Sequence, residues 1–242
     1  DYAPIVAKYR QKTAIFALST FFHPIIISMR KISTLLLLLL SGTAAFGQSV
    51  PELLWYKFDG SGNTVPNLAS NPPTGTANAT LMGGLTQGGS GICGGTAIGT
   101  GISSTTDYVN TGWATNLTGT SWTISMRTKD IIGTSTLYYV FGDANAAGFR
   151  CFTNGVAGAN NWILRGPVSD LLCTGCAGAP NNMTTFVYDN VAGNTKAYLN
   201  GVLVTTVTQV APTIASAGPF KVVGYSANVG APLNWLLDDF RV

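Results

Sequence analysis

The stretch KAYLNGVLVT, residues 196–205, decides the fold. Two short runs of strand-favouring residues flank Asn200-Gly201, a dipeptide that supplies the two positive-φ positions of a type I′ turn. A two-residue loop of this type places Leu199 opposite Val202 in an antiparallel hairpin. Because both faces of the hairpin then carry apolar side chains, we expect these strands to be covered on two sides or shielded by a loop.

Similar runs of strand length recur along the chain beyond residue 47. This part is rich in Gly, Thr, Ala, Asn and Val and poor in Glu, Lys and Arg, which favours strands and tight turns over helices. No stretch of twelve residues has apolar positions at helical spacing. The predicted strands are Leu53–Phe58, Ala79–Met82, Thr96–Gly99, Asp107–Asn110, Trp122–Lys129, Thr136–Phe141, Phe149–Thr153, Trp162–Leu164, Thr184–Asp189, Lys196–Leu199, Val202–Thr208, Phe220–Val223 and Trp235–Val242. So many strands in one domain predict two packed sheets or a barrel.

The N-terminal part has the composition of an export signal. Met29-Arg30-Lys31 is a basic start, Ile32–Leu40 is a short apolar run, and Ala45-Phe46-Gly47 is a small-x-small cleavage site. These features predict a signal peptide at 29–47 and a secreted or cell-surface protein. The apolar run is short for a membrane span, so an uncleaved anchor is the weaker alternative. Residues 1–28 are interpreted as a disordered leader or as upstream sequence translated from a misplaced start.

The predicted mature domain, residues 48–242, has a length that suits a single core. Of the 13 basic and 10 acidic residues in the chain, it keeps eight and nine. Its net charge is therefore −1, whereas the whole chain carries +3. No basic surface indicates nucleic acid as a partner. We also expect no membrane span in the mature chain.

Glutamate and histidine, two residue types that often transfer protons in catalysis, are scarce in this sequence. Glu52 is the single glutamate, and His23, in the leader, is the single histidine. Acid–base catalysis on sugars uses two facing carboxylic acids, and catalytic triads and zinc centres usually include histidine. Asp238 and Asp239 are adjacent, so a regular strand would turn them to opposite faces. The sequence therefore favours a protein without catalytic activity, and a site built from two aspartates on separate loops is the catalytic alternative.

Several stretches beyond residue 50 occur in a particular order. They are LWYKFDGSGNT (54–64), GGTA (94–97) followed by DYV (107–109), WTIS (122–125), FVYD (186–189), KAYLNG (196–201) and LDDFRV (237–242). In this order they resemble the bacterial laminin G-like (LamG) jelly-roll domains. The resemblance implies an all-β, concanavalin A-like jelly-roll sandwich of two antiparallel sheets with roughly six or seven strands each.

That superfamily includes both lectins and enzymes, so the fold alone does not decide the function. Its laminarinase-like enzymes carry Glu-x-Asp-x-x-Glu on one strand, and no segment of 48–242 supplies this motif. We therefore predict a secreted or surface recognition module that binds a glycan or a surface protein. A purely structural domain of a larger surface protein and a divergent glycoside hydrolase are the alternatives.

All four cysteines lie beyond the leader, and an even number in an oxidising compartment favours disulfides. Cys173 and Cys176 are separated by a short turn with a glycine, so a small-ring bridge is expected there. Cys93 and Cys151 are the pair that is left. A zinc site would need a second close pair, and a redox Cys-x-x-Cys would need a βαβ setting.

The resemblance also implies a calcium ion that ties the opening turn to the closing strand. Asp59 and Asn63 lie in that turn and Asp238 in that strand, and oxygen ligands of these types suit Ca²⁺. The alternative is that Asp59 only caps its own turn through nearby backbone amides.

Exposed aromatic side chains beside polar loops are the candidate contacts for a sugar. Trp55, Trp122 and Trp235 lie inside apolar strands and are interpreted as core residues instead. The candidate ligand contacts are Trp113, Asp143, Asn145, Asn161 and Trp162.

Overall fold

The computed structural model describes residues 51–95, 97–98, 105–143, 148–225, 230 and 234–242. The chain divides into two units, Asp1–Val50 and Pro51–Val242. The predictions for residues 1–28 and for the signal peptide at 29–47 lie outside the described residues. Within these residues the helical structure is a single 3₁₀ turn, η1 (Gly155–Ala157). No helix among them has the length and apolar character needed to cross a membrane.

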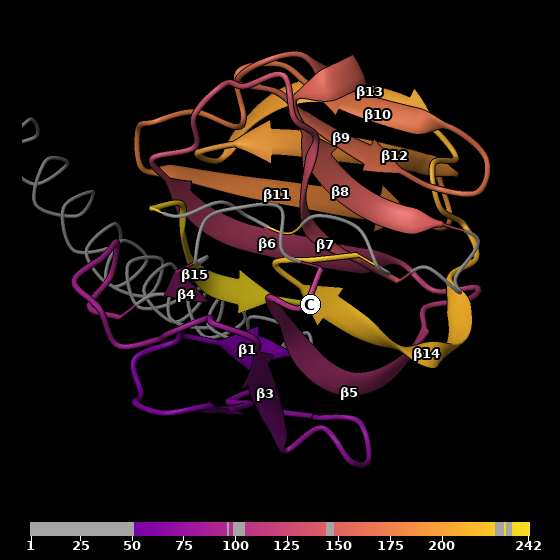
Figure 1. Cartoon of the computed structure of the whole chain (residues 1–242). Coiled ribbons are helices and arrows are strands. Elements are labelled where there is room, and N and C mark those ends of the chain that lie inside the picture. Colours follow the sequence, from indigo (N-terminus) through magenta and orange to yellow (C-terminus); the bar gives the residue numbers. More distant parts are fainter. Residues whose placement is uncertain (1–50, 96, 99–104, 144–147, 226–229, 231–233) are drawn as a thin grey trace, which may run out of the picture. The chain divides into compact units, whose positions relative to one another are not determined.

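The described strands form two antiparallel sheets, which confirms the predicted all-β sandwich (Figure 1). Sheet A has the order β1 (Trp55–Tyr56), β15 (Leu236–Arg241), β6 (Trp122–Lys129), β11 (Asn182–Asp189), β12 (Asn194–Leu199) and β13 (Val202–Thr208), and β4 (Ala97–Ile98) also pairs with β15. Sheet B has the order β10 (Asp170–Cys173), β9 (Trp162–Arg165), β8 (Phe149–Thr153), β7 (Tyr138–Asp143), β14 (Ala215–Val222), β5 (Tyr108–Asn116), β3 (Asn78–Met82) and β2 (Thr64–Pro66).

An aromatic layer holds the two sheets together. Phe141 on β7 of sheet B lies with its ring centre 5.7 Å from Phe240 on β15 and 6.4 Å from Phe186 on β11, both in sheet A. Phe220 on β14 adds a second ring 6.2 Å from Phe240. All four side chains are fully buried. Edge-to-face and tilted contacts of this kind add to the stabilisation that burial of the rings already supplies.

The predicted hairpin is present at the edge of sheet A. Asn200 and Gly201 have φ of 50° and 83°, as a type I′ turn requires, and Leu199 pairs with Val202. However, β13 is the last strand of its sheet, and Val202 and Leu203 are 69% and 52% exposed. The expectation that both faces of this hairpin are covered is therefore wrong.

The cysteines form one bridge instead of two. Cys173 and Cys176 are joined, with Cα atoms 5.6 Å apart, as predicted. The predicted Cys93–Cys151 bridge is corrected by the structure, in which both are free thiols. Cys151 points from β8 into the core, whereas Cys93 lies in an exposed loop. Burial raises the pKa of the Cys151 thiol well above its usual value, so this thiol stays protonated and unreactive.

We predict that the substitution Phe141→Ala lowers the free energy of unfolding by about 3–5 kcal/mol, because it leaves a cavity between the two sheets. Urea denaturation followed by tryptophan fluorescence measures this loss. Val191→Ala is the control, since Val191 is 97% exposed and its truncation should change the stability by no more than about 0.5 kcal/mol. A loss at Phe141 no larger than in this control would contradict the aromatic layer.

Candidate functional site

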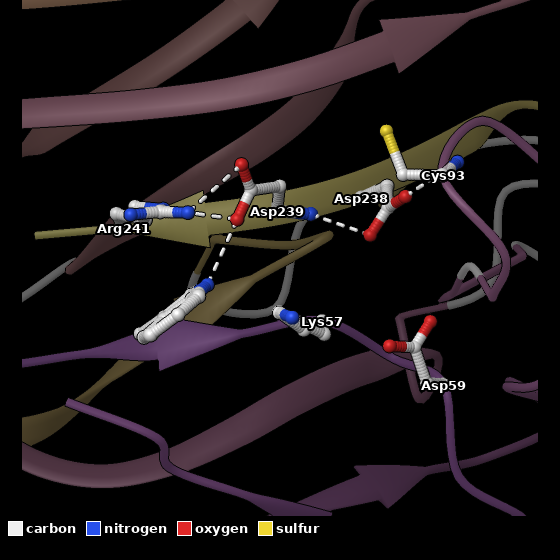
Figure 2. Close-up of a pocket in the computed structure, with 7 residues that line it drawn as sticks. Lys57, Asp59, Cys93, Asp238, Asp239 and Arg241 are labelled. Atoms are coloured by element: carbon white, nitrogen blue, oxygen red, sulfur yellow. Dashed lines mark hydrogen bonds and ion pairs between the residues drawn. The ribbon is translucent and has the colours of Figure 1, made fainter.

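A pocket of about 390 Å³ opens on the outer face of sheet A, where the first strand of the domain meets the last. Its residues come from β1 and the segment that follows it, from β15 and from the loop that contains Cys93 (Figure 2). We call it the β1–β15 pocket; it is lined by Trp55, Lys57, Asp59, Cys93, Asp238, Asp239 and Arg241. Three carboxylates, two cations and one indole ring therefore share one small volume.

Residues 54–59, of which Trp55–Tyr56 form β1, supply the pocket through side chains that alternate between the core and the outer face. Side chains along a strand point in turn to opposite faces of the sheet. Leu54, Tyr56 and Phe58 are buried in the core, whereas Trp55, Lys57 and Asp59 line the pocket. The interpretation of Trp55 as a core residue is therefore wrong, because its neighbours occupy the core side and its own ring is only partly covered.

The last strand supplies the pocket through a bulge. Asp239 has a φ of 48°, and the register between β15 and β6 shifts between Asp238 and Arg241. A bulge adds a residue to one strand and re-aims the side chains beside it. Both aspartates therefore line the same pocket, contrary to the expectation that neighbours in the sequence point to opposite faces.

Arg241 clamps the outer carboxylate. Its Nε donates to Asp239 Oδ1 at 2.9 Å and its Nη2 to Oδ2 at 3.3 Å, while the Trp55 indole donates to Oδ1 at 2.8 Å. The guanidinium lies 4.2 Å from the centre of the Trp55 ring, and Nη1 donates to Glu52 at 3.0 Å. Asp239 is thus held by charge-assisted bonds that also fix the indole.

Asp238 anchors two backbone segments from a buried position. Its Oδ1 accepts the N–H of Asp239 at 2.7 Å, and its Oδ2 accepts the N–H of Cys93 at 2.9 Å. Burial raises the pKa of this carboxyl, and the charge of Asp59 adds to the effect, although the two N–H bonds oppose it. Partial desolvation and the charge of Asp238 also raise the pKa of the exposed Cys93 thiol.

Two of the three predicted calcium ligands share this pocket. Asp59 and Asp238 both line it, but Asn63 is not among the lining residues. Lys57 and Arg241 bring positive charge to the same volume. Calcium prefers six to eight oxygen ligands, and the described part of the chain has no group of three histidine, cysteine or acidic side chains that could hold a metal ion. The calcium ion stays a prediction.

The two predicted tryptophan contacts lie in the core, which corrects their assignment. Trp113 is 4% exposed, with its ring centre 5.6 Å from that of Phe220. Trp162 is fully buried and packs edge-on against Trp235 at 6.5 Å. Because each alternate position on β5 and β9 faces the other sheet, neither indole offers a ring face to a sugar.

The polar members of the predicted ligand set hold the structure together instead. Asp143 is buried and accepts hydrogen bonds from Thr115 at 2.8 Å and Ser216 at 2.9 Å, which links β7 to β5 and β14. Asn161 accepts from the backbone N–H of Gly175 at 2.9 Å and so braces the turn of the disulfide. Asn145 lies outside the described residues.

The sequence matches no protein-family model and no curated protein. Its fold is similar to the binding domain of Paraclostridial Mosquitocidal Protein 1, with a TM-score of 0.55 at 11% identity over 79% of this chain and 48% of that chain. It is also similar to the botulinum neurotoxin type G receptor-binding domain, at 0.53 and 12% over 79% and 47%. The botulinum neurotoxin serotype D binding domain gives 0.51 and 13% over the same shares. This chain spans about half the length of these structures, and the likeness shows a shared jelly-roll-like β-sandwich.

We predict that Asp239→Asn lowers the free energy of unfolding by about 1–2 kcal/mol, because the neutral amide loses the two-point contact with Arg241 and weakens the bond to Trp55. The matched control is Asp170→Asn, which breaks the exposed pair with Arg165 and should cost at most about 1 kcal/mol. Chemical denaturation measures both. Equal losses in the two variants would mean that the clamp adds nothing beyond a surface ion pair.

Thermal unfolding tests the calcium prediction. If an ion binds between Asp59 and Asp238, millimolar calcium should raise the melting temperature relative to excess chelator, since a ligand of the folded state stabilises it. The rise should disappear in Asp59→Asn. An identical melting temperature in calcium and in chelator would remove the ion from this pocket.

Proposed function

We propose that this domain is a LamG-like recognition module that binds carbohydrate in the β1–β15 pocket and does not catalyse a reaction. The observation that carries the proposal is that some side chains lining the pocket are held by internal hydrogen bonds and others are not. Internal hydrogen bonds occupy the side chains of Asp238, Asp239 and Arg241. In contrast, the side chains of Lys57 and Asp59, which also line the pocket, make no hydrogen bond to any described residue.

Lys57 and Asp59 are suited to hydroxyl groups. An ammonium group donates three hydrogen bonds and a carboxylate accepts several, so together they can bind neighbouring hydroxyls of a sugar. Both are exposed, and the Lys57 ammonium lies 5.1 Å from the centre of the partly covered Trp55 ring. A rigid base with a few convergent polar groups is the usual form of a small-molecule site. The similar solved structures are a toxin binding domain and a receptor-binding domain, which supports recognition in this coarse sense.

One observation favours the alternative of a divergent glycoside hydrolase. A carboxyl with a raised pKa next to a second carboxylate is the arrangement that separates an acid from a nucleophile or base. Asp238 and Asp59 have this relation. Against it, both Asp238 oxygens already accept backbone N–H groups, so the carboxyl holds the bulge and the Cys93 loop in place.

We propose that the domain works outside the cell. The Cys173–Cys176 bridge supports this, because such bonds persist in oxidising compartments. The predicted signal peptide gives the same location.

The domain, residues 48–242, should bind at least one glycan on an array. Lys57→Ala and Asp59→Asn should each weaken that binding about tenfold or more, because each removes a hydrogen bond that involves a charged group. Lys196→Ala is the control: it removes one positive charge on β12 and should leave binding unchanged. Melting temperatures verify that each variant is folded.

Two results would contradict the proposed function. A folded domain that binds no glycan would leave a purely structural role. Turnover of chromogenic or polymeric glucans that is lost in both Asp59→Asn and Asp238→Asn would make the pocket an active site.

A further inference from the structure

A second surface, on the outer face of sheet B, has a different chemistry from the β1–β15 pocket. Phe149 and Cys151 on β8 point into the core, so Arg150 between them points outward. Cross-strand pairing continues from Arg150 in both directions along one line. The resulting row, which we call the arginine row, consists of Asp170 on β10, Arg165 on β9, Arg150 on β8, Gly142 on β7 and Lys221 on β14.

Aromatic rings lie against the cations of this row. The Arg150 guanidinium lies 5.0 Å from the ring centre of Tyr225 and 5.9 Å from that of Phe152. Tyr139 joins them, with its ring centre 5.0 Å from Tyr225. At the far end, the Lys221 ammonium lies 4.0 Å from the Tyr108 ring. The row is therefore a platform of positive charges and half-exposed tyrosine rings, above the buried ring of Phe152.

Gly142 allows the platform to form. A Cβ atom at this position would lie 2.7 Å from Cδ2 of Tyr225 and 2.9 Å from Cβ of Arg150. Contacts this short do not occur between real side chains, so any larger residue would displace the ring. The absence of a side chain on β7 lets Tyr225 lie across the strand beside the guanidinium.

Arg150 and Arg165 differ in their partners. Arg165 forms an ion pair with Asp170, and its Nε lies 2.7 Å from Oδ1 of that residue. Arg150 has no carboxylate partner among the described residues; its Nη1 donates to Gly148 O at 2.7 Å and to the Tyr225 hydroxyl at 3.4 Å. Its Nε is buried and has no acceptor. Nη2 makes no hydrogen bond to a described residue and is not among the buried atoms, so it is the donor that an external anion can reach.

We propose that the arginine row binds a sugar that carries a carboxylate, with the acid group on Arg150 and the sugar ring against Tyr225. A guanidinium donates charge-assisted hydrogen bonds to carboxylate oxygens, and Nη2 of Arg150 is the terminal nitrogen not used by internal bonds. The rings of Tyr225 and Tyr139 supply an apolar surface for the sugar. This site lies on the sheet opposite to the β1–β15 pocket, and the proposal does not depend on the function proposed for that pocket.

The test uses isothermal titration of the domain with oligogalacturonate, a neutral galactan oligosaccharide and heparin oligosaccharide. We expect oligogalacturonate to bind at least about tenfold more tightly than the neutral sugar. Arg150→Gln and Tyr225→Ala should each weaken its binding about tenfold or more, whereas Tyr225→Phe should retain most of it. Arg127→Gln is the matched control, because it removes the same charge from β6 of sheet A and should change binding less than about twofold.

Three outcomes would overturn the proposal. The first is the absence of binding to oligogalacturonate. The second is an equal loss in Arg150→Gln and Arg127→Gln, which would show attraction by net charge alone. The third is heparin binding that is tighter than oligogalacturonate binding and insensitive to Tyr225→Ala, which would identify a sulfate site without a platform. Lys57→Ala and Asp59→Asn should leave oligogalacturonate binding intact, so failure of this site and failure of the β1–β15 pocket can be told apart.

Discussion

The aromatic layer between the sheets is the constraint on which the rest of the structure depends. Once Phe141 and Phe220 of sheet B pack against Phe240 of sheet A, the alternation along each strand sets which side chains remain outside. Tyr56 pairs with Phe240 and faces inward, so Trp55 pairs with Arg241 and faces outward. Phe149 faces inward, so Arg150 faces outward. Core packing therefore sets which strand side chains each proposed binding surface exposes, and the Cys93 loop and Tyr225 complete the two surfaces.

Much of the fold was predictable because it follows from local chemistry. The bounds of β6, β8 and β13 agree with the predicted ranges, since each is a continuous run of strand-favouring residues. The strands β2 and β10 were not predicted, because β2 ends in proline and β10 begins with an aspartate, and both residue types are depleted in strands. Their pairing partners stabilise them, and a partner far along the chain leaves no signal in a short window of sequence.

The sites were harder to predict, and the reasons are physical. Trp55, Trp113 and Trp162 look alike in the sequence, yet one lines a pocket and two lie in the core. Alternation with Leu54, Tyr56 and Phe58 would have separated Trp55 from the others. No local sequence pattern predicts the bulge at Asp239, because the positive φ of this aspartate is set by the pairing of β15 with β6. Without that bulge the carboxylates of Asp238 and Asp239 would point to opposite faces of the sheet and would not line the same pocket.

The two surfaces differ in charge in a way that bears on what each can hold. The β1–β15 pocket places three carboxylates beside two cations, and its internal bonds already neutralise most of them. The arginine row places three cations beside one carboxylate, that of Asp170, which forms an ion pair with Arg165. A neutral ligand suits the first surface, because it can exchange hydrogen bonds without adding charge. An anionic ligand suits the second, because Arg150 has no carboxylate partner among the described residues and its Nη2 makes no hydrogen bond to them. One sandwich with a net charge close to zero can thus present two unlike surfaces, since each sheet exposes the side chains that its own core face excludes.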